Sequence, residues 1–237
     1  MSRGLKFKRL LLKVSGEVVG GESASIDFEK VDSFADELKE ALSVGGEIAV
    51  VMGGGNIIRG YKATQRGVDR VTADSMGMLG TIINSMALQS ALEQKGVDAR
   101  VMTSISMEQF AEPYIRRRAL SHLKKGRIVI LAGGTGNPYF TTDTAAALRA
   151  VEIEADALLK GTKVDGIYSG DPETDPNATK ISDLTYIDVL KKDLRIMDAT
   201  AIALCRENNI PIIVFNLFEK GNLKRVLEGE KLGTIVK

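Results

Sequence analysis

The decisive stretch of this sequence is Arg127-Ile-Val-Ile-Leu-Ala-Gly-Gly-Thr-Gly-Asn-Pro-Tyr-Phe-Thr-Thr-Asp143. Its aliphatic run, Ile128 to Leu131, predicts a buried strand, and small turn-forming residues follow from Ala132 to Pro138. A strong helix-forming segment begins directly after Asp143. A strand, a glycine-rich loop and a helix start, in that order, place backbone N–H groups and the positive end of a helix where an anion can bind. We therefore expect a phosphate-bearing ligand at this loop.

The same alternation of strand and helix recurs along the chain. Aliphatic runs and apolar residues at helical spacing predict the other elements, which are strands at 10–14, 47–52, 97–103, 157–160 and 210–215 and helices at 27–43, 72–94, 108–125, 144–152, 187–192, 198–208 and 223–227. Such alternation indicates an α/β fold with a mainly parallel sheet covered on both faces. Ligands of these folds bind beyond the carboxyl ends of the strands.

The bulk composition excludes several functional classes. Lys plus Arg number 32 against 31 Asp plus Glu, so the 237 residues carry no charge bias toward nucleic acid or anionic membrane. The single cysteine, Cys205, excludes an internal disulfide and a cysteine-rich metal site, and its apolar segment favours a core residue over a reactive thiol. No apolar run approaches the roughly 18 residues of a membrane helix. We do not expect the first residues to form a signal peptide, because their apolar stretch is short. We expect a soluble protein of a reducing compartment.

Two further loops resemble the first in being glycine-rich and in following a strand. Lys13 interrupts the first strand, which ends at Ser15-Gly16, and is either a functional lysine or one that extends from the sheet edge into solvent. Gly53-Gly54-Gly55 follows the second strand and lets the backbone approach a ligand. Arg59 could hold a phosphate through its planar guanidinium; the alternative is a tight turn followed by a solvent-exposed arginine.

Acidic residues near two other loops have competing explanations. Thr72 is the predicted N-cap of the long helix at 72–94, and Asp74 falls in its first turn, where the helix dipole alone could account for an acid. The loop at 161–171 combines glycines, a tyrosine and acids, and suggests a second ligand surface. Asp198 is the expected cap of a later helix.

Several common catalytic motifs are missing from the sequence. It contains no Gly-x-x-x-x-Gly-Lys-Ser/Thr, no Gly-x-Gly-x-x-Gly opening the first helix and no Gly-x-Ser-x-Gly. A single histidine, His122, nearly excludes histidine-based acid–base chemistry. What remains are two lysines in strands, Lys13 and Lys160, the glycine loops and Asp143. Phosphoryl transfer needs mainly positioning and charge neutralisation, which these groups could supply together with Mg²⁺.

Five motifs of the chain, in order, closely resemble those of the bacterial uridylate kinases, which belong to the amino acid kinase fold family. They are Leu12-Lys-Val-Ser-Gly-Glu17, Gly53-Gly-Gly-Asn-Ile-Ile-Arg-Gly60, Asp69-Arg-Val-Thr-Ala-Asp74-Ser-Met-Gly-Met78, Gly133-Gly-Thr-Gly-Asn-Pro-Tyr-Phe-Thr-Thr-Asp143 and Lys160-Gly-Thr-Lys-Val-Asp-Gly-Ile-Tyr168. The resemblance runs the length of the chain. The loop from Thr135 to Thr142 makes it specific to the uridylate kinases.

The resemblance implies ATP-dependent conversion of UMP to UDP in de novo pyrimidine nucleotide synthesis. The Mg²⁺ would be carried by ATP, with no metal ligand in the chain. The implied fold is a three-layer α/β/α sandwich with a mainly parallel sheet, formed by one domain over 1–237 whose N-terminal part binds UMP and whose C-terminal part binds ATP. The implied enzyme is a cytoplasmic homohexamer, activated by GTP and inhibited by UTP, and it needs neither nucleic acid nor membrane.

The resemblance also implies roles for individual residues. Lys13 and Lys160 would be catalytic, and Asp143 would order them. The implied ATP contacts are Lys13, Val14, Ser15, Gly16, Gly55, Arg59, Thr162, Tyr168 and Asp171. The implied UMP contacts are Gly54, Asp74, Thr135, Gly136, Asn137, Pro138, Tyr139, Phe140, Thr141 and Thr142.

Two other functions stay open at this point. A kinase of the same fold acting on a carboxylate, a carbamate or isopentenyl phosphate would share Lys13, the glycine loops and Asp143. It would have no reason to carry the loop from Thr135 to Thr142 together with Asp74. A nucleotide-binding regulatory module without turnover could dispense with Lys13 or Asp143, yet both are present.

Overall fold

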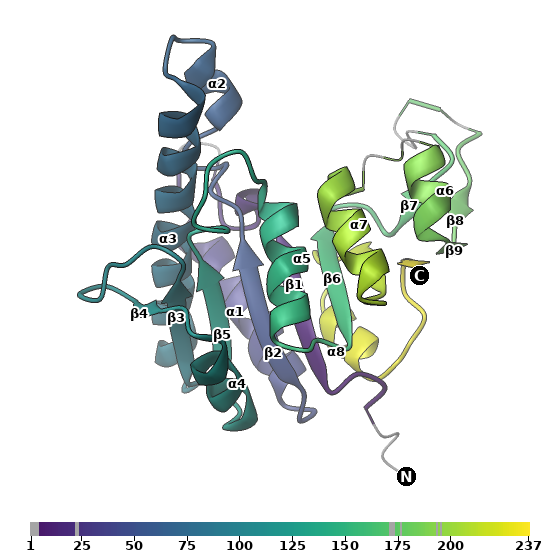
Figure 1. The fold of residues 1–237 in the computed structure, drawn as a ribbon. Helices are drawn as coiled ribbons and strands as arrows, with labels where there is room; N and C mark the ends of the chain where they lie inside the picture. Colours follow the sequence, from purple (N-terminus) through teal and green to yellow (C-terminus); the bar gives the residue numbers. More distant parts are fainter. Residues whose placement is uncertain (1–4, 22–23, 171–173, 176, 193, 195) are drawn as a thin grey trace.

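A computed structural model of the chain describes residues 5–21, 24–170, 174–175, 177–192, 194 and 196–237. Within them, nine strands form one sheet (Figure 1). Their order across the sheet is β4 (Glu112–Pro113), β3 (Ala99–Thr103), β5 (Ile128–Ala132), β2 (Glu47–Met52), β1 (Arg9–Val14), β6 (Ala157–Thr162), β10 (Ile212–Asn216), β11 (Thr234–Val236) and β9 (Asp183–Leu184). All neighbouring pairs in this sheet are parallel except β10 with β11. The predicted mainly parallel sheet is confirmed.

Helices cover both faces of this sheet. The helices of the described residues are α1 (Phe28–Leu42), α2 (Gly60–Thr64), α3 (Arg70–Gln94), α4 (Arg116–Lys124), α5 (Thr142–Glu152), α6 (Tyr186–Lys191), α7 (Ala199–Glu207) and α8 (Asn222–Leu227), with a short 3₁₀ helix, η1, at Gly16–Val18. A separate small sheet pairs β7 (Ile167–Tyr168) with β8 (Lys180–Ile181).

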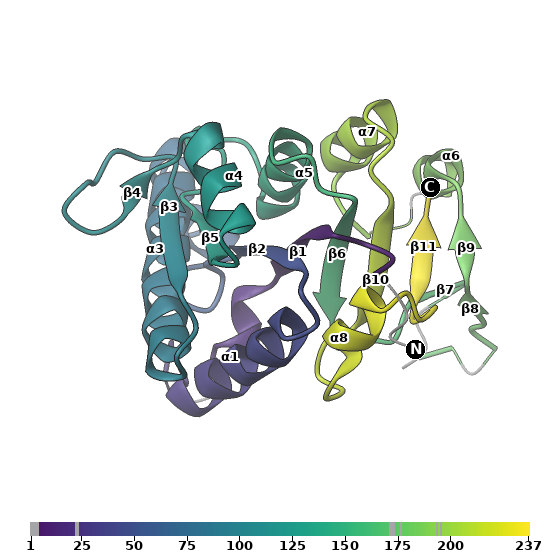
Figure 2. The same ribbon diagram turned by 90° about the horizontal axis from the view of Figure 1, so that it is seen from below.

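Alternate residues of the central strands supply two hydrophobic cores. Leu10 and Leu12 of β1 face one core, which includes buried residues of α1, α3 and α8. Leu11 faces the other, which includes buried residues of α4, α5 and α7. Figure 2 shows α1 and α8 on one side of the sheet and α4, α5 and α7 on the other. Because side chains alternate between faces with a period of two, one central strand serves both layers, and the three-layer α/β/α sandwich is confirmed.

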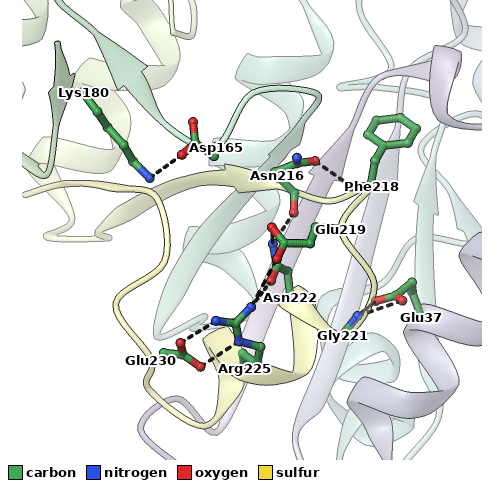
Figure 3. Close-up of polar contacts among 10 residues, drawn as sticks. All are labelled: Glu37, Asp165, Lys180, Asn216, Phe218, Glu219, Gly221, Asn222, Arg225 and Glu230. Carbon is green, nitrogen blue, oxygen red and sulfur yellow. Dashed lines mark hydrogen bonds and ion pairs between the residues drawn. The ribbon is translucent and has the colours of Figure 1, made fainter.

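A polar contact joins the start of α8 to α1. The carboxylate of Glu37 in α1 accepts hydrogen bonds from the backbone N–H of Gly221, at 3.0 and 3.1 Å (Figure 3). Partial burial raises the pKa of Glu37, and this hydrogen bond opposes the increase. The contact fixes the segment that follows β10 against the first helix.

Three helix starts differ from the prediction by two residues or more. Helix α5 begins at Thr142 and not at Thr144, because Thr141 caps it by accepting from the backbone N–H groups of Asp143 and Thr144. The long helix α3 begins at Arg70, and its N-cap is Asp69, whose Oδ1 accepts from the backbone N–H of Thr72 at 3.0 Å. The expected N-cap, Thr72, lies in the first turn because Asp69 offers an equally good cap one turn earlier. The helix predicted at 108–125 begins only at Arg116, since Pro113 lacks an N–H group and disfavours helix in the residue before it.

Cys205 is a core residue, as its apolar segment predicts. The side chain of Cys205, in α7, is fully buried in the core, and burial raises the pKa of its thiol to about 12. Among the described residues, no helix combines the length and the apolar character needed to cross a membrane.

Candidate active site

Two lysines meet one aspartate at the centre of the sheet. The register of β1 and β6 places Lys13 opposite Lys160, so both side chains leave the same face of the sheet. Asp143, in the first turn of α5, lies above that face. Its Oδ1 is 2.6 Å from Lys13 Nζ, without the alignment of a hydrogen bond, and its Oδ2 is 3.5 Å from Lys160 Nζ. The structure brings together the three residues predicted to be catalytic.

This cluster is shielded from solvent and carries more positive than negative charge. The side chains of Lys13, Asp143 and Lys160 are only 12–17% exposed. Burial lowers the pKa of Lys160; the Asp143 carboxylate opposes this shift, and the Lys13 ammonium adds to it. Lys160 Nζ also donates to the backbone carbonyl of Ile196. Two ammonium groups on one carboxylate leave positive charge available for a phosphoryl group.

A cavity of about 240 Å³ lies between the two glycine-rich loops after β2 and β5. Its lining includes Gly54, Gly55, Asp74, Gly134, Thr135, Asn137, Phe140, Thr141 and Thr142. Most of the residues predicted to contact the acceptor therefore surround one space. Gly136, Pro138 and Tyr139 are not in its lining, although they belong to the same loop.

Asp74 is hydrogen-bonded to the loop from Thr135 to Thr142, which lines this cavity. Its Oδ2 accepts hydrogen bonds from the backbone N–H of Tyr139 and from Arg70 Nε, both at 2.8 Å. Tyr139 has a φ of 71°, which non-glycine residues rarely adopt. The helix-dipole explanation of Asp74 is therefore incomplete, because its carboxylate also determines the position of the loop.

The loop after β1 is in direct contact with the loop after β2. A Cβ atom on Gly16 would lie 2.7 Å from the Gly53 carbonyl oxygen, so only glycine allows this approach. Ser15 caps η1 by accepting from the backbone N–H of Glu17 at 3.3 Å. Arg59 forms an ion pair with Glu17 at 2.5 Å. The residues predicted to contact the donor phosphates thus lie together at the carboxyl edge of β1 and β2.

A second cavity of about 250 Å³ lies beyond the carboxyl end of β6. Its lining includes Lys160, Thr162, Gly166, Tyr168, Leu194 and Ile196. The Tyr168 hydroxyl donates to Asp165 at 2.6 Å, and Asp165 pairs with Lys180 at 2.8 Å (Figure 3). Residues between Thr162 and Gly170 of the loop at 161–171, which the sequence predicts to form a second ligand surface, therefore line a cavity. Asp171, expected to contact ATP, lies outside the described residues.

Asp198 has a wider role than the helix cap expected from the sequence. Its carboxylate accepts from the backbone N–H of Ala201 at 2.9 Å, and also from the hydroxyls of Thr141 and Thr144 in the α5 region. Burial would raise the pKa of Asp198, but these hydrogen bonds outweigh it and hold the pKa below its usual range. No local sequence pattern indicates this contact, because Thr141 and Asp198 are 57 positions apart.

The carboxylates near the cluster do not form a metal site. Among the described residues, no group of three or more His, Cys, Asp or Glu side chains lies close enough together to hold a metal ion. Both oxygens of Asp143 face lysine ammonium groups, which does not fit a metal ligand.

Comparison with known proteins places this geometry in a family. Residues 8–216 match the model of the Amino acid kinase family. The UMP kinase of Bacillus anthracis is 41% identical over 98% of this chain and 96% of its own, with a TM-score of 0.94. The UMP kinase of Ureaplasma parvum is 38% identical over 97% of this chain and 98% of its own, with a TM-score of 0.91. The uridylate kinase of Archaeoglobus fulgidus is 28% identical over 96% of this chain and 99% of its own, with a TM-score of 0.75. The chain belongs to the amino acid kinase family.

Proposed function

We propose that this protein is a UMP kinase, which transfers the γ-phosphoryl group of ATP to UMP and releases UDP and ADP. The observation that carries the proposal is the Lys13–Asp143–Lys160 cluster at the carboxyl edge of the sheet, where Lys160 lines one cavity and Thr142, the residue before Asp143, lines the other. The similarity to solved UMP kinases over nearly the whole chain supports UMP as the acceptor.

The lysines act on the phosphoryl group in transfer. Negative charge on its oxygens must be neutralised while the acceptor and leaving oxygens stay in line, and little covalent chemistry is left for the protein. The ammonium groups of Lys13 and Lys160 supply that charge. Asp143 keeps them close together despite their mutual repulsion, so it acts by positioning and not as a base.

The two cavities have separate substrates in this proposal. The space lined by Gly54, Asp74 and the loop from Thr135 to Thr142 holds UMP, with Asp74 binding the ribose. The ATP phosphates lie against Lys13, Val14, Ser15, Gly16, Gly55 and Arg59, and the rest of ATP lies near Thr162, Tyr168 and Asp171. One domain over 1–237 thus binds UMP mainly through its N-terminal part, and its C-terminal part binds the portion of ATP beyond the phosphates.

Mg²⁺ belongs to ATP in this proposal. Because the Asp143 carboxylate is engaged by two lysines, the ATP phosphates and water would supply the metal ligands. When bound, the ion would neutralise phosphate charge, alongside the lysines.

The surface of α3 supports self-association. Met76, Leu79, Ile83 and Met86 are each 39–47% exposed and recur at helical spacing, so they form an apolar stripe along one face. We assign this stripe to a subunit contact in a cytoplasmic homohexamer. Activation by GTP and inhibition by UTP complete the proposal.

The decisive experiment incubates the purified protein with Mg-ATP and a panel of acceptors while ADP release is followed. We expect turnover with UMP far above that with CMP, dUMP, glutamate or carbamate. A preference for glutamate or carbamate would identify another kinase of the same fold. Absence of turnover with every acceptor would indicate a binding module.

A further inference from the structure

The middle of α3 is unusual because its buried face is polar. Thr81, Asn84 and Ser85 are each no more than 5% exposed, in a helix whose opposite face carries the exposed apolar stripe. Buried polar side chains are costly unless they are hydrogen-bonded, so their partners indicate what they do. Two of the three reach beyond the helix, each to a different glycine loop.

Asn84 holds the loop that follows β2. Its side-chain amide donates to the Gly53 carbonyl at 2.8 Å and forms a reciprocal pair with the amide of Asn56, at 2.8 and 3.0 Å. Asn56 in turn donates to the Ser25 carbonyl at 2.7 Å. A Cβ atom on Gly16 would lie 2.2 Å from Asn56 Oδ1, so the same amide pair also packs closely against the backbone of the loop after β1.

Thr81, one turn earlier, holds the loop that follows β5. Its hydroxyl accepts a buried hydrogen bond from the backbone N–H of Gly133 at 2.9 Å and donates to the Met78 carbonyl at 2.7 Å. Gly133 opens the glycine run that leads to Asp143. The hydroxyl therefore satisfies the first backbone donor of the acceptor loop.

The backbone of α3 also lies against the first of these loops. A Cβ atom on Gly54 would lie 2.6 Å from the Gly77 carbonyl oxygen and 2.9 Å from the Thr81 nitrogen. Glycine inside a helix is destabilising relative to alanine. Gly80 packs closely against Gly54, since a Cβ atom on Gly80 would lie 3.3 Å from the Gly54 carbonyl oxygen. This contact explains why a glycine stands inside the helix.

We propose that Asn84 and Thr81 are positioning residues for phosphoryl transfer, through which one helix fixes the backbones of both glycine loops. Asn84 positions the loops of both nucleotides, because it hydrogen-bonds to Gly53 and fixes the Asn56 amide against which Gly16 packs. Thr81 sets the acceptor loop alone. This inference rests on the proposed UMP kinase activity and assigns α3 a role in the geometry of the site.

The test is steady-state kinetics of isosteric variants of the full-length protein, with UMP and ATP varied separately. Asn84→Leu removes the amide, and we expect kcat/KM to fall by about tenfold or more for both nucleotides, as when buried partners lose a hydrogen bond. Thr81→Val removes the hydroxyl, and we expect a similar rise in KM for UMP with little change in KM for ATP. Thr81→Ser, which restores the hydroxyl, should recover the wild-type KM.

The matched control is Ser85→Ala. Ser85 is equally buried in α3, but its hydroxyl donates to the Thr81 carbonyl within the helix at 2.7 Å. The Ser85→Ala variant should be less stable than the wild type, but its KM values for UMP and ATP should not change. If Asn84→Leu does not fold, Asn84→Ser carries the same expectation.

Three results would overturn the inference. The first is unchanged kinetics in folded Asn84→Leu and Thr81→Val. The second is a loss no different from that of Ser85→Ala, and the third is failure of Thr81→Ser to recover the KM. Calorimetric titration with UMP and a non-hydrolysable ATP analogue gives the same comparison without turnover. Absence of UMP turnover by the wild type would count against the proposed function, and the titration would still judge the two positions.

Discussion

Asp143 shows how much a single carboxylate can contribute without joining the chemistry. Replacing it with asparagine keeps its shape but removes the charge that holds Lys13 and Lys160 together. We expect Asp143→Asn to lower kcat by about 100-fold or more, the range seen when a preorganised electrostatic contact is lost. The KM for UMP should change much less. Steady-state kinetics and calorimetric UMP binding measure both quantities, and an equal or larger loss of UMP affinity would contradict the positioning role.

The charge of Lys160 predicts the pH dependence of the reaction. Its pKa lies below the ordinary 10.5 because the side chain is buried. A lysine loses its charge as pH rises, so a lowered pKa moves this loss, and the decline in kcat, to lower pH. Lys160→Arg keeps its charge throughout the accessible range. We expect the alkaline decline of kcat to shift upward in this variant, even if its maximal rate is lower. Identical alkaline profiles would assign the decline to another group.

Local sequence patterns single out the residues of the central cluster, but their arrangement is implied only by the family resemblance. Lys13 and Asp143 are conspicuous in sequence because each lies beside a glycine-rich loop after an apolar run. Their meeting depends on the register that places Lys13 opposite Lys160, which is set by pairing between strands nearly 150 residues apart in the chain. Asn84 and Asn56 form their pair across two different elements, so neither residue is distinctive in its own segment.

At the scale of whole elements, two helix caps differ in the range of their contacts. Asp69 caps α3 alone, whereas Asp198 caps α7 and also binds the start of α5 through Thr141 and Thr144. The capping role of Asp198 was predictable from the residues after it. Its contact with α5 was not, because that contact requires two helices distant in sequence to pack side by side.

This difference predicts the effect of removing each cap. Asp198→Ala should lower the free energy of unfolding by about 2–3 kcal/mol, because a cap and two further hydroxyl partners are lost together. Asp69→Ala should lower it by less, since one capping interaction is lost. Urea denaturation followed by circular dichroism measures both values. Equal losses in the two variants would mean that the link from α7 to α5 adds nothing to stability.

At the scale of the whole molecule, the sandwich was predictable because alternating strands and helices allow few other architectures. The short strands toward the two edges of the sheet were less predictable. The antiparallel strand β11 and the two-residue strands β4 and β9 have no strong apolar pattern of their own, and Glu112–Pro113 lay inside a predicted helix. Such short strands form because a neighbouring strand offers free backbone groups, which is information that the local sequence does not contain.

The exposed apolar stripe on α3 predicts that this helix takes part in a subunit contact. Ile83 is 47% exposed within the apolar stripe, and a charge there would have to be buried in any contact that covers the stripe. We expect Ile83→Glu to form smaller particles than the wild type in sedimentation velocity, while its circular dichroism stays unchanged. Phe28→Glu is the matched control, because Phe28 is 69% exposed on a different helix, α1. If Ile83→Glu keeps the mass of the wild type, the subunit contact does not include this stripe. If it dissociates, kinetics on the smaller particle will show whether α3 holds the two glycine loops equally well without its neighbour.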